Sequence, residues 1–117
     1  MNNTFIYLKT CDTCRKILAA INLPSYYTLR EIKTTPLNTS EIEFLGKLQG
    51  SYVDLINKRA QKFQTEPYSS IVLNEKTAKK LLAEDYTFLK RPILVTEGKM
   101  VAGNGKSEVE LMKKYAR

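Results

Sequence analysis

Residues 4–14 read TFIYLKTCDTC, and they place two cysteines at the junction between a strand and a helix. The run Thr4–Leu8 is rich in β-branched and aromatic residues, which predicts a first strand. From Cys14 to Ile21 apolar residues recur at helical spacing, and the asparagine and proline that follow indicate the end of this helix. The motif that begins at Cys11 therefore lies where a predicted strand gives way to a predicted helix.

A CxxC motif at the start of a helix has a specific chemistry. Unpaired backbone N–H groups and the helix dipole favour an anion there, so the pKa of Cys11 is expected to fall below the ordinary cysteine value. Cys14, one turn further, can attack a mixed disulfide formed on Cys11. Arg15 and Lys16 add positive charge, while Asp12 opposes it. The motif predicts a redox-active dithiol, and the alternative is a pair of buried structural cysteines.

The composition excludes several other kinds of site. The chain contains no histidine, which rules out Ser-His-Asp and Cys-His catalysis, and two cysteines alone cannot supply a four-ligand Cys/His zinc site. The formal net charge is +7, which favours anionic partners or serves only solubility. The basic residues are scattered and no aromatic-basic motif accompanies them, which argues against direct nucleic-acid binding.

The length and the hydropathy pattern predict one cytoplasmic domain. A chain of 117 residues has the size of a single domain with one core. Its longest apolar runs span only a few residues, so no membrane span is expected, and the N-terminus shows no signal peptide. We therefore expect residues 1–117 to form one domain in the cytoplasm, without contact to a membrane.

A second strand and a helical insert are expected after the first helix. Ser25–Ile32 alternates well enough for a strand, so the opening is a βαβ unit with parallel strands. Residues from about 34 to 85 then carry mostly helical signals. The predicted helices of this insert run from Thr39 to a stop at Gly50, over Ser51–Lys58, and over Asn74–Glu84, with Asn74 as the predicted N-cap.

The last third of the chain predicts two strands and a closing helix. Pro92–Val95 is a continuous apolar run typical of a central strand, and Met100–Ala102 returns beside it after a turn. Ser107–Tyr115 is the closing helix, and its Ser107–Glu110 spacing, like that of Ser40 and Glu43, predicts a capping box. This order of elements is that of a thioredoxin-like α/β core with helices inserted between the second and third strands.

The pair Arg91-Pro92 is a second chemical clue. A proline that opens a central strand cannot donate a hydrogen bond to the ladder. In thioredoxin-like folds such a residue forms a cis-proline loop that faces the reactive cysteine, and Arg91 would then direct its guanidinium at an anion beside the sulfur. The alternative is an ordinary turn proline beside a solvated arginine. Arg59, which with Lys58 and Lys62 forms a basic group, is a weaker candidate for binding the same anion.

Three stretches together resemble the arsenate reductase (ArsC) family, which also contains the Spx regulators and YffB-type proteins. The resemblance covers about residues 4–115 and implies a thioredoxin-like fold with a helical subdomain after the second strand. It implies that Cys11 takes up arsenate while Arg59 and Arg91 hold the oxyanion. No tightly bound cofactor is expected, and the implied reductant is glutathione with glutaredoxin, or thioredoxin. The stretches are Cys11-xx-Cys14-Arg15-Lys16 after the first strand, Ile56-Asn57-Lys58-Arg59, and Arg91-Pro92-Ile93-Leu94-Val95.

Two departures from the glutathione-dependent arsenate reductases leave two functions open. Lys106 stands at the place of a third family arginine, and a lysine cannot reproduce a bidentate fork. The second departure is Cys14, because those reductases generally use one catalytic cysteine. The CxxC motif that Cys14 completes is more similar to that of Spx, in which the motif is a disulfide switch. In Spx a glycine that matches Gly50 lies on the surface that binds the C-terminal domain of the RNA polymerase α subunit, although here a simple helix cap is an alternative.

The preferred function is a thiol-dependent oxidoreductase that acts on a small oxyanion or a thiol substrate, with a redox protein as a partner. Its nucleophile would be Cys11, and Cys14 would be the resolving thiol. The other function is an Spx-like redox-sensing regulator that binds the RNA polymerase α subunit.

Overall fold

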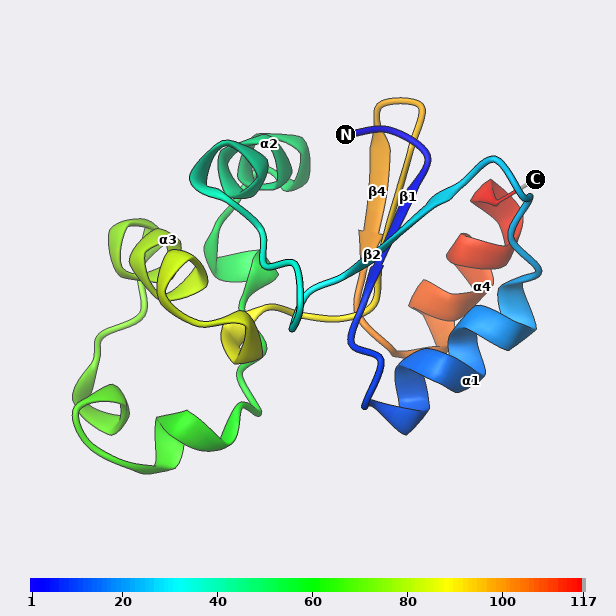
Figure 1. Cartoon of the computed structure of the whole chain (residues 1–117). Coiled ribbons are helices and arrows are strands. Elements are labelled where there is room, and N and C mark those ends of the chain that lie inside the picture. Colours follow the sequence, from blue (N-terminus) through cyan, green and yellow to red (C-terminus); the bar gives the residue numbers. More distant parts are fainter. Residues whose placement is uncertain (117) are drawn as a thin grey trace. The chain divides into compact units, whose positions relative to one another are not determined.

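The computed structural model describes residues 1–116, and the chain divides into two compact units. The first unit comprises Met1–Pro36 and the chain from Arg91 onward, and the second comprises Leu37–Lys90. Figure 1 shows the strands of the sheet in the first unit, and helices α2 (Thr39–Gln49) and α3 (Glu75–Glu84) in the second. The helical segment predicted between the second and third strands thus forms a compact unit of its own.

The first unit is built on a four-stranded sheet with the strand order β2-β1-β3-β4. β1 and β2 are parallel, whereas β3 runs antiparallel to both β1 and β4. The βαβ opening and the central place of the third strand confirm what the sequence predicts, and the fold is thioredoxin-like with a helical insert. The strands are β1 (Thr4–Tyr7), β2 (Thr28–Glu31), β3 (Ile93–Thr96) and β4 (Lys99–Ala102).

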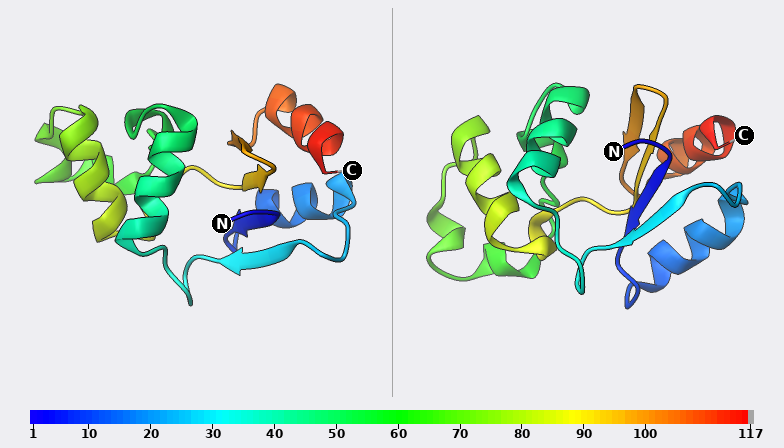
Figure 2. Two further views of the ribbon diagram at one scale, coloured as in Figure 1. Left: turned by 90° about the horizontal axis from the view of Figure 1, so that it is seen from above. Right: turned by 45° about the horizontal axis from the view of Figure 1, so that its top comes forward.

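Helices α1 (Asp12–Ile21) and α4 (Lys106–Tyr115) pack on the same face of this sheet (Figure 1, Figure 2). Phe5 of β1 and Leu94 of β3 are fully buried in the core between the sheet and these helices, together with Met112 of α4. Burying large side chains of this kind contributes about 1.5–3 kcal/mol each. The other buried members of this core are Ile17, Ile21, Tyr27, Val101 and Ala116.

The second unit contains α2 (Thr39–Gln49), which packs against α3 (Glu75–Glu84). Gly50 ends α2 in the left-handed region, with φ 88°, as expected for a glycine helix cap. Short 3-10 turns make up much of the remainder of the unit. They are Val53–Leu55, Gln61–Gln64, Tyr68–Ser70 and Tyr86–Phe88.

The helix predicted over Ser51–Lys58 is wrong, because only the turn Val53–Leu55 forms there. Ile56 leaves the helical conformation and pairs as an antiparallel bridge with Leu89. The N–H of Asn57 donates to the Phe88 carbonyl at 2.7 Å, and the N–H of Lys90 donates to the Leu55 carbonyl at 2.8 Å. These hydrogen bonds to a distant segment satisfy backbone groups that a helix would otherwise pair locally.

The N-terminal caps of two helices differ from the prediction, although α2 begins at Thr39 as expected. Asn38, not Ser40, caps α2: its side chain accepts a hydrogen bond from the Glu41 N–H, and the Glu41 carboxylate accepts one from the Asn38 N–H. The capping box predicted at Ser107 is also wrong, since α4 begins one residue earlier and Ser107 falls inside its first turn. Asn74 caps α3 as predicted.

Within residues 1–116, no helix combines the length and apolarity needed to cross a membrane.

Candidate active site

Cys11 lies at the N-terminal end of α1, after the turn that follows β1. Its N–H donates to the Leu8 carbonyl at 3.0 Å, which closes this turn. Its carbonyl accepts a hydrogen bond from the Arg15 N–H at 3.1 Å, so Cys11 is the N-cap residue of the helix. The side chain is partly buried. The thiol therefore stands at the helix end where backbone N–H groups favour an anion.

Interactions at the helix N-terminus stabilise the Cys11 thiolate. Burial raises the pKa of the Cys11 thiol, but hydrogen bonding with the backbone and the thiol of Cys14 and with the backbone of Thr13 outweighs this effect. The positive charge of Arg91 acts in the same direction. Together these interactions hold the pKa of Cys11 below its ordinary value. A larger fraction of this thiol is therefore ionised at neutral pH than in an ordinary cysteine.

Cys14 has the opposite electrostatic character. It is fully buried in the first turn of α1, and burial raises the pKa of its thiol to about 11. The hydrogen bond with the Cys11 side chain and the charge on Cys11 act in the same direction as burial, while the backbone of Leu8 and the charge of Arg91 oppose them. Cys14 therefore keeps its proton under conditions in which Cys11 has lost much of its own.

Arg91 and Pro92 precede β3 in the same unit as the two cysteines. The Arg91–Pro92 peptide bond is cis, and Pro92 is buried. The Pro92 carbonyl accepts a hydrogen bond from the Gly103 N–H at 2.9 Å, which ties this loop to the end of β4. The Arg91 side chain is partly buried, and its charge lowers the pKa of both thiols. The structure thus brings Arg91 together with the two cysteines.

Arg59 and Lys106 lie in different units. Arg59 is exposed in the second unit, and its neighbour Lys62 forms an ion pair with Asp85. Lys106 is the first residue of α4 in the first unit and is also exposed. The part that Arg59 and Lys106 play in binding an oxyanion stays a prediction.

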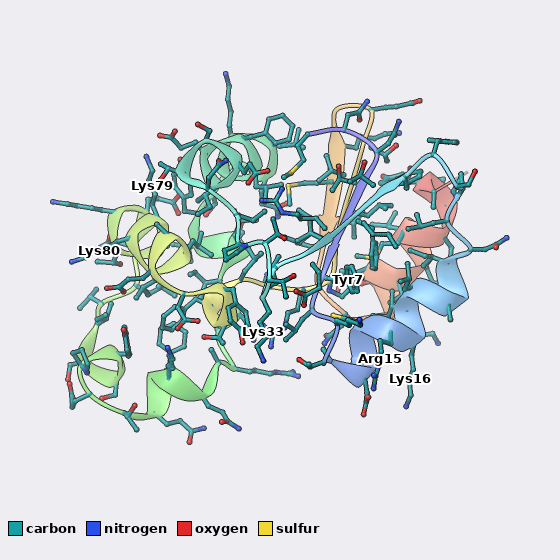
Figure 3. The ribbon with its side chains drawn as sticks, in the orientation of Figure 1. Tyr7, Arg15, Lys16, Lys33, Lys79 and Lys80 are labelled. Carbon is teal, nitrogen blue, oxygen red and sulfur yellow. The ribbon has the colours of Figure 1, made fainter. Side chains whose placement is uncertain are left out.

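The charges on the first turns of α1 partly offset one another. Figure 3 shows Arg15 and Lys16 on the N-terminal half of this helix. Arg15 forms an ion pair with the carboxylate of Asp12, and both side chains are exposed. An exposed pair of this kind contributes little to stability, about 0–1 kcal/mol. Its effect here is to neutralise part of the positive charge that the sequence places beside Cys11.

Glu31 is a neighbour of this site that the sequence patterns do not reveal. It ends β2, and its carboxylate accepts a hydrogen bond from the N–H of Lys9, two residues before Cys11. A single glutamate at the end of a strand matches no motif. The only available signal is the parallel pairing of β1 with β2, which sets Glu31 opposite Tyr7 at the end of β1.

The two thiols are expected to react with an alkylating agent over different pH ranges. Only the thiolate reacts, so the lowered pKa of Cys11 keeps it reactive at a pH where an ordinary cysteine is protonated. Cys14, with a pKa of about 11, should react only in strong alkali. Iodoacetamide labelling between about pH 5 and 10, followed by peptide mass spectrometry, should trace the ionisation of Cys11 while Cys14 stays largely unlabelled. Equal labelling of the two cysteines near neutral pH would contradict the assignment.

Comparison with known proteins adds family evidence to this geometry. The model of the ArsC family matches residues 7–112. The global transcriptional regulator Spx of Streptococcus agalactiae is 26% identical over 108 residues, which cover 91% of this chain and 79% of that protein. An ArsC family related protein from Bacteroides fragilis is 25% identical with a TM-score of 0.69, over 93% of this chain and 95% of that one. An arsenate reductase from Vibrio cholerae shares the fold at 16% identity and a TM-score of 0.69, over 98% and 99% of the two chains.

Proposed function

The chain belongs to the ArsC family, and from this membership we propose that it is a thiol-dependent oxidoreductase with Cys11 as the nucleophile and Cys14 as the resolving thiol. The family relationship supports either a thiol-dependent reductase or an Spx-like regulator. The observation that carries the first choice is the contrast between the two thiols, since the pKa of Cys11 is lowered and that of Cys14 is raised. A nucleophile must be ionised before it attacks, whereas a resolving thiol acts only afterwards.

Reduction of a disulfide would proceed in two exchanges. The Cys11 thiolate attacks one sulfur of the substrate, forms a mixed disulfide and releases the first substrate thiolate. Cys14 then loses its proton to the departing group and attacks the Cys11 sulfur, which releases the second substrate thiol and leaves a Cys11–Cys14 disulfide. The protein gives the substrate two electrons and the Cys14 proton, and the second proton, which protonates the first released thiolate, comes from solvent. Two external thiols would return the enzyme to its reduced state.

Reduction of an oxyanion such as arsenate would use the same thiols. The Cys11 thiolate bonds to arsenic(V), and one arsenate oxygen leaves as water after it is protonated. Cys14 then transfers its proton to an oxygen of the departing arsenic group and attacks the Cys11 sulfur. The sulfur–arsenic bond breaks, and its electron pair stays on arsenic, which leaves as arsenite. Arg91 would hold the oxyanion beside the sulfur through its planar set of donors. Lys106, in the same unit, would add positive charge.

Turnover assays test this proposal directly. The purified protein is offered a small disulfide or arsenate, each with glutathione and glutaredoxin and each with the thioredoxin system. These are the cytoplasmic reductants that suit a protein with two reduced thiols. Turnover of either substrate supports the proposal and identifies the reductant. Absence of turnover in all four combinations would overturn it.

Replacement of Arg91 by alanine or by lysine is expected to separate its effect on the pKa of Cys11 from its proposed binding of the oxyanion. Arg91→Ala removes a positive charge, so the pH profile of Cys11 alkylation should move to higher pH. It should also raise KM for arsenate by roughly tenfold or more, the effect of losing a hydrogen bond to a charged group. Arg91→Lys keeps the charge but not the bidentate geometry, so it should restore the alkylation profile and leave KM high. If KM is unchanged in both variants, Arg91 does not bind the oxyanion.

A second candidate function is a redox-sensing regulator, favoured by the similarity to Spx. Its switch would be the reversible disulfide between Cys11 and Cys14, and its partner the C-terminal domain of the RNA polymerase α subunit. Gly50 is exposed and the space beside its Cα is open, so that surface is accessible to a partner. A pull-down with this polymerase domain, in reductant and in oxidant, tests the candidate. Binding in neither state would eliminate it.

A further inference from the structure

The Glu31 carboxylate accepts hydrogen bonds from backbone N–H groups in the segments that follow β1 and β2. Its Oε2 accepts a hydrogen bond from the N–H of Lys9 at 2.9 Å. Its Oε1 accepts from the N–H groups of Lys33 and Thr34 at 2.9 and 2.8 Å, and from the Thr34 hydroxyl at 3.0 Å. One partly buried side chain therefore joins the end of β2 to the segment between β1 and α1.

The Lys9 N–H lies in the turn that connects β1 to Cys11, the N-cap residue of α1. This turn runs from Leu8 to Cys11 and is closed by the hydrogen bond from the Cys11 N–H to the Leu8 carbonyl. The strand before it is anchored to β2, because the N–H of Ile32 donates to the Tyr7 carbonyl at 3.0 Å. The Glu31 carboxylate extends this anchoring past the end of the ladder and into the turn.

We propose that Glu31 is a positioning residue for Cys11, because its carboxylate holds the turn that places the sulfur at the N-terminus of α1. The inference rests on the proposed role of Cys11 as the nucleophile. Burial raises the pKa of Glu31, but the hydrogen bonds from Lys9, Thr34 and Lys33 together outweigh it and hold the pKa below its usual range. At neutral pH the group is therefore ionised, and both oxygens accept hydrogen bonds.

Substitution by glutamine breaks one of these links selectively. An amide keeps a single acceptor oxygen and gains an NH₂ group that can only donate. In Glu31→Gln the oxygen is expected to stay with Lys33 and Thr34, where three hydrogen bonds converge. The NH₂ group then faces the Lys9 N–H, and because both groups are donors, no hydrogen bond forms between them. The turn before Cys11 thereby loses its hydrogen bond to residue 31.

A positioning role and a purely electrostatic role predict opposite results. Loss of a negative charge near Cys11 would by itself lower the pKa of this thiol. Loss of the turn anchor instead moves the sulfur away from the N–H groups of Thr13 and Cys14, which raises the pKa of Cys11. The direction of the shift therefore distinguishes the two roles. The other ionisable groups that act on the Cys11 sulfur, Cys14 and Arg91, are unchanged in the variant.

The matched control is Glu75→Gln in the second unit. Glu75 likewise accepts several hydrogen bonds, from the Ser51 hydroxyl at 2.7 Å and from the N–H groups of Tyr52 and Val53 at 2.6 and 3.2 Å. Its replacement should lower stability by a similar mechanism without touching the turn before Cys11. Thermal unfolding of both variants verifies that each is folded at the temperature of the assay.

The experiment measures the rate of Cys11 alkylation by iodoacetamide as a function of pH. We expect the profile of Glu31→Gln to move to higher pH, with alkylation near neutral pH slower by roughly threefold or more, and that of Glu75→Gln to match the wild type. An unchanged profile or a move to lower pH in Glu31→Gln would overturn the positioning role. An ordinary cysteine profile in the wild-type protein would instead refute the nucleophile itself, so the two failures are distinguishable.

Discussion

Replacing Cys11 by serine is expected to reduce turnover of any substrate by roughly a thousandfold or more. A serine hydroxyl is not ionised at neutral pH, and it cannot form the disulfide or the sulfur–arsenic bond that each proposed reaction requires. The measurement is the coupled turnover assay with the substrate and reductant that support the wild-type protein. Retention of most of the activity would show that Cys11 is not the nucleophile.

The matched variant Cys14→Ser separates the two steps. Its Cys11 can still attack, so a disulfide substrate should leave one equivalent of mixed disulfide on the protein, detectable by intact mass. Multiple turnover should then depend on an external thiol that replaces Cys14. If Cys14→Ser turns over like the wild type even with little external thiol, Cys14 is a structural core residue, as its complete burial would also allow.

The largest effect on stability is expected from Phe5→Ala. Phe5 is fully buried on β1, where it pairs with Leu94 of β3 and packs in the core beneath α1 and α4. Removing a buried phenylalanine ring costs about 3–5 kcal/mol, because the surrounding side chains only partly fill the space. Small domains have a free energy of unfolding of about 5–15 kcal/mol, so this variant should lose a large part of it. Urea unfolding measures the difference.

Leu29→Ala is the control for this substitution. Leu29 pairs with Phe5 across the parallel strands, but it lies on the edge strand β2 with 50% of its surface exposed. Its truncation removes little buried area and should cost about 1 kcal/mol or less. Equal losses in Phe5→Ala and Leu29→Ala would mean that the core does not centre on the inner strands.

Local sequence signals were sufficient for most of the first unit. The strand before Cys11, the helix after it and the hairpin of β3 and β4 follow from periodicity, turn residues and a continuous apolar run. Each of these signals lies within the element that it specifies. The same holds for Asn74, which caps α3 through hydrogen bonds to a residue three positions away.

The wrong helix prediction falls where pairing with a distant segment overrides the local preference for a helix. The helix predicted over Ser51–Lys58 gives way to a bridge between Ile56 and Leu89, a partner more than thirty positions away. Helical spacing in that stretch could not reveal this partner. Capping boxes are ambiguous for another reason, since Asn38 and Ser40 both offer a side-chain acceptor near the start of α2.

The sequence alone predicted a redox-active dithiol and determined its place in the chain, because a CxxC between a strand and a helix is a local feature. Arg91 was likewise predicted from the sequence, because it precedes a proline that opens a predicted central strand. Only the tertiary structure decided the contrast between the two thiols, since the pKa of Cys14 depends on its burial under the sheet and helices. The same is true of Glu31, whose hydrogen bond to Lys9 requires β2 to lie beside β1 in one register. Burial and register arise from contacts between segments far apart in the chain, and no local pattern of residues specifies them.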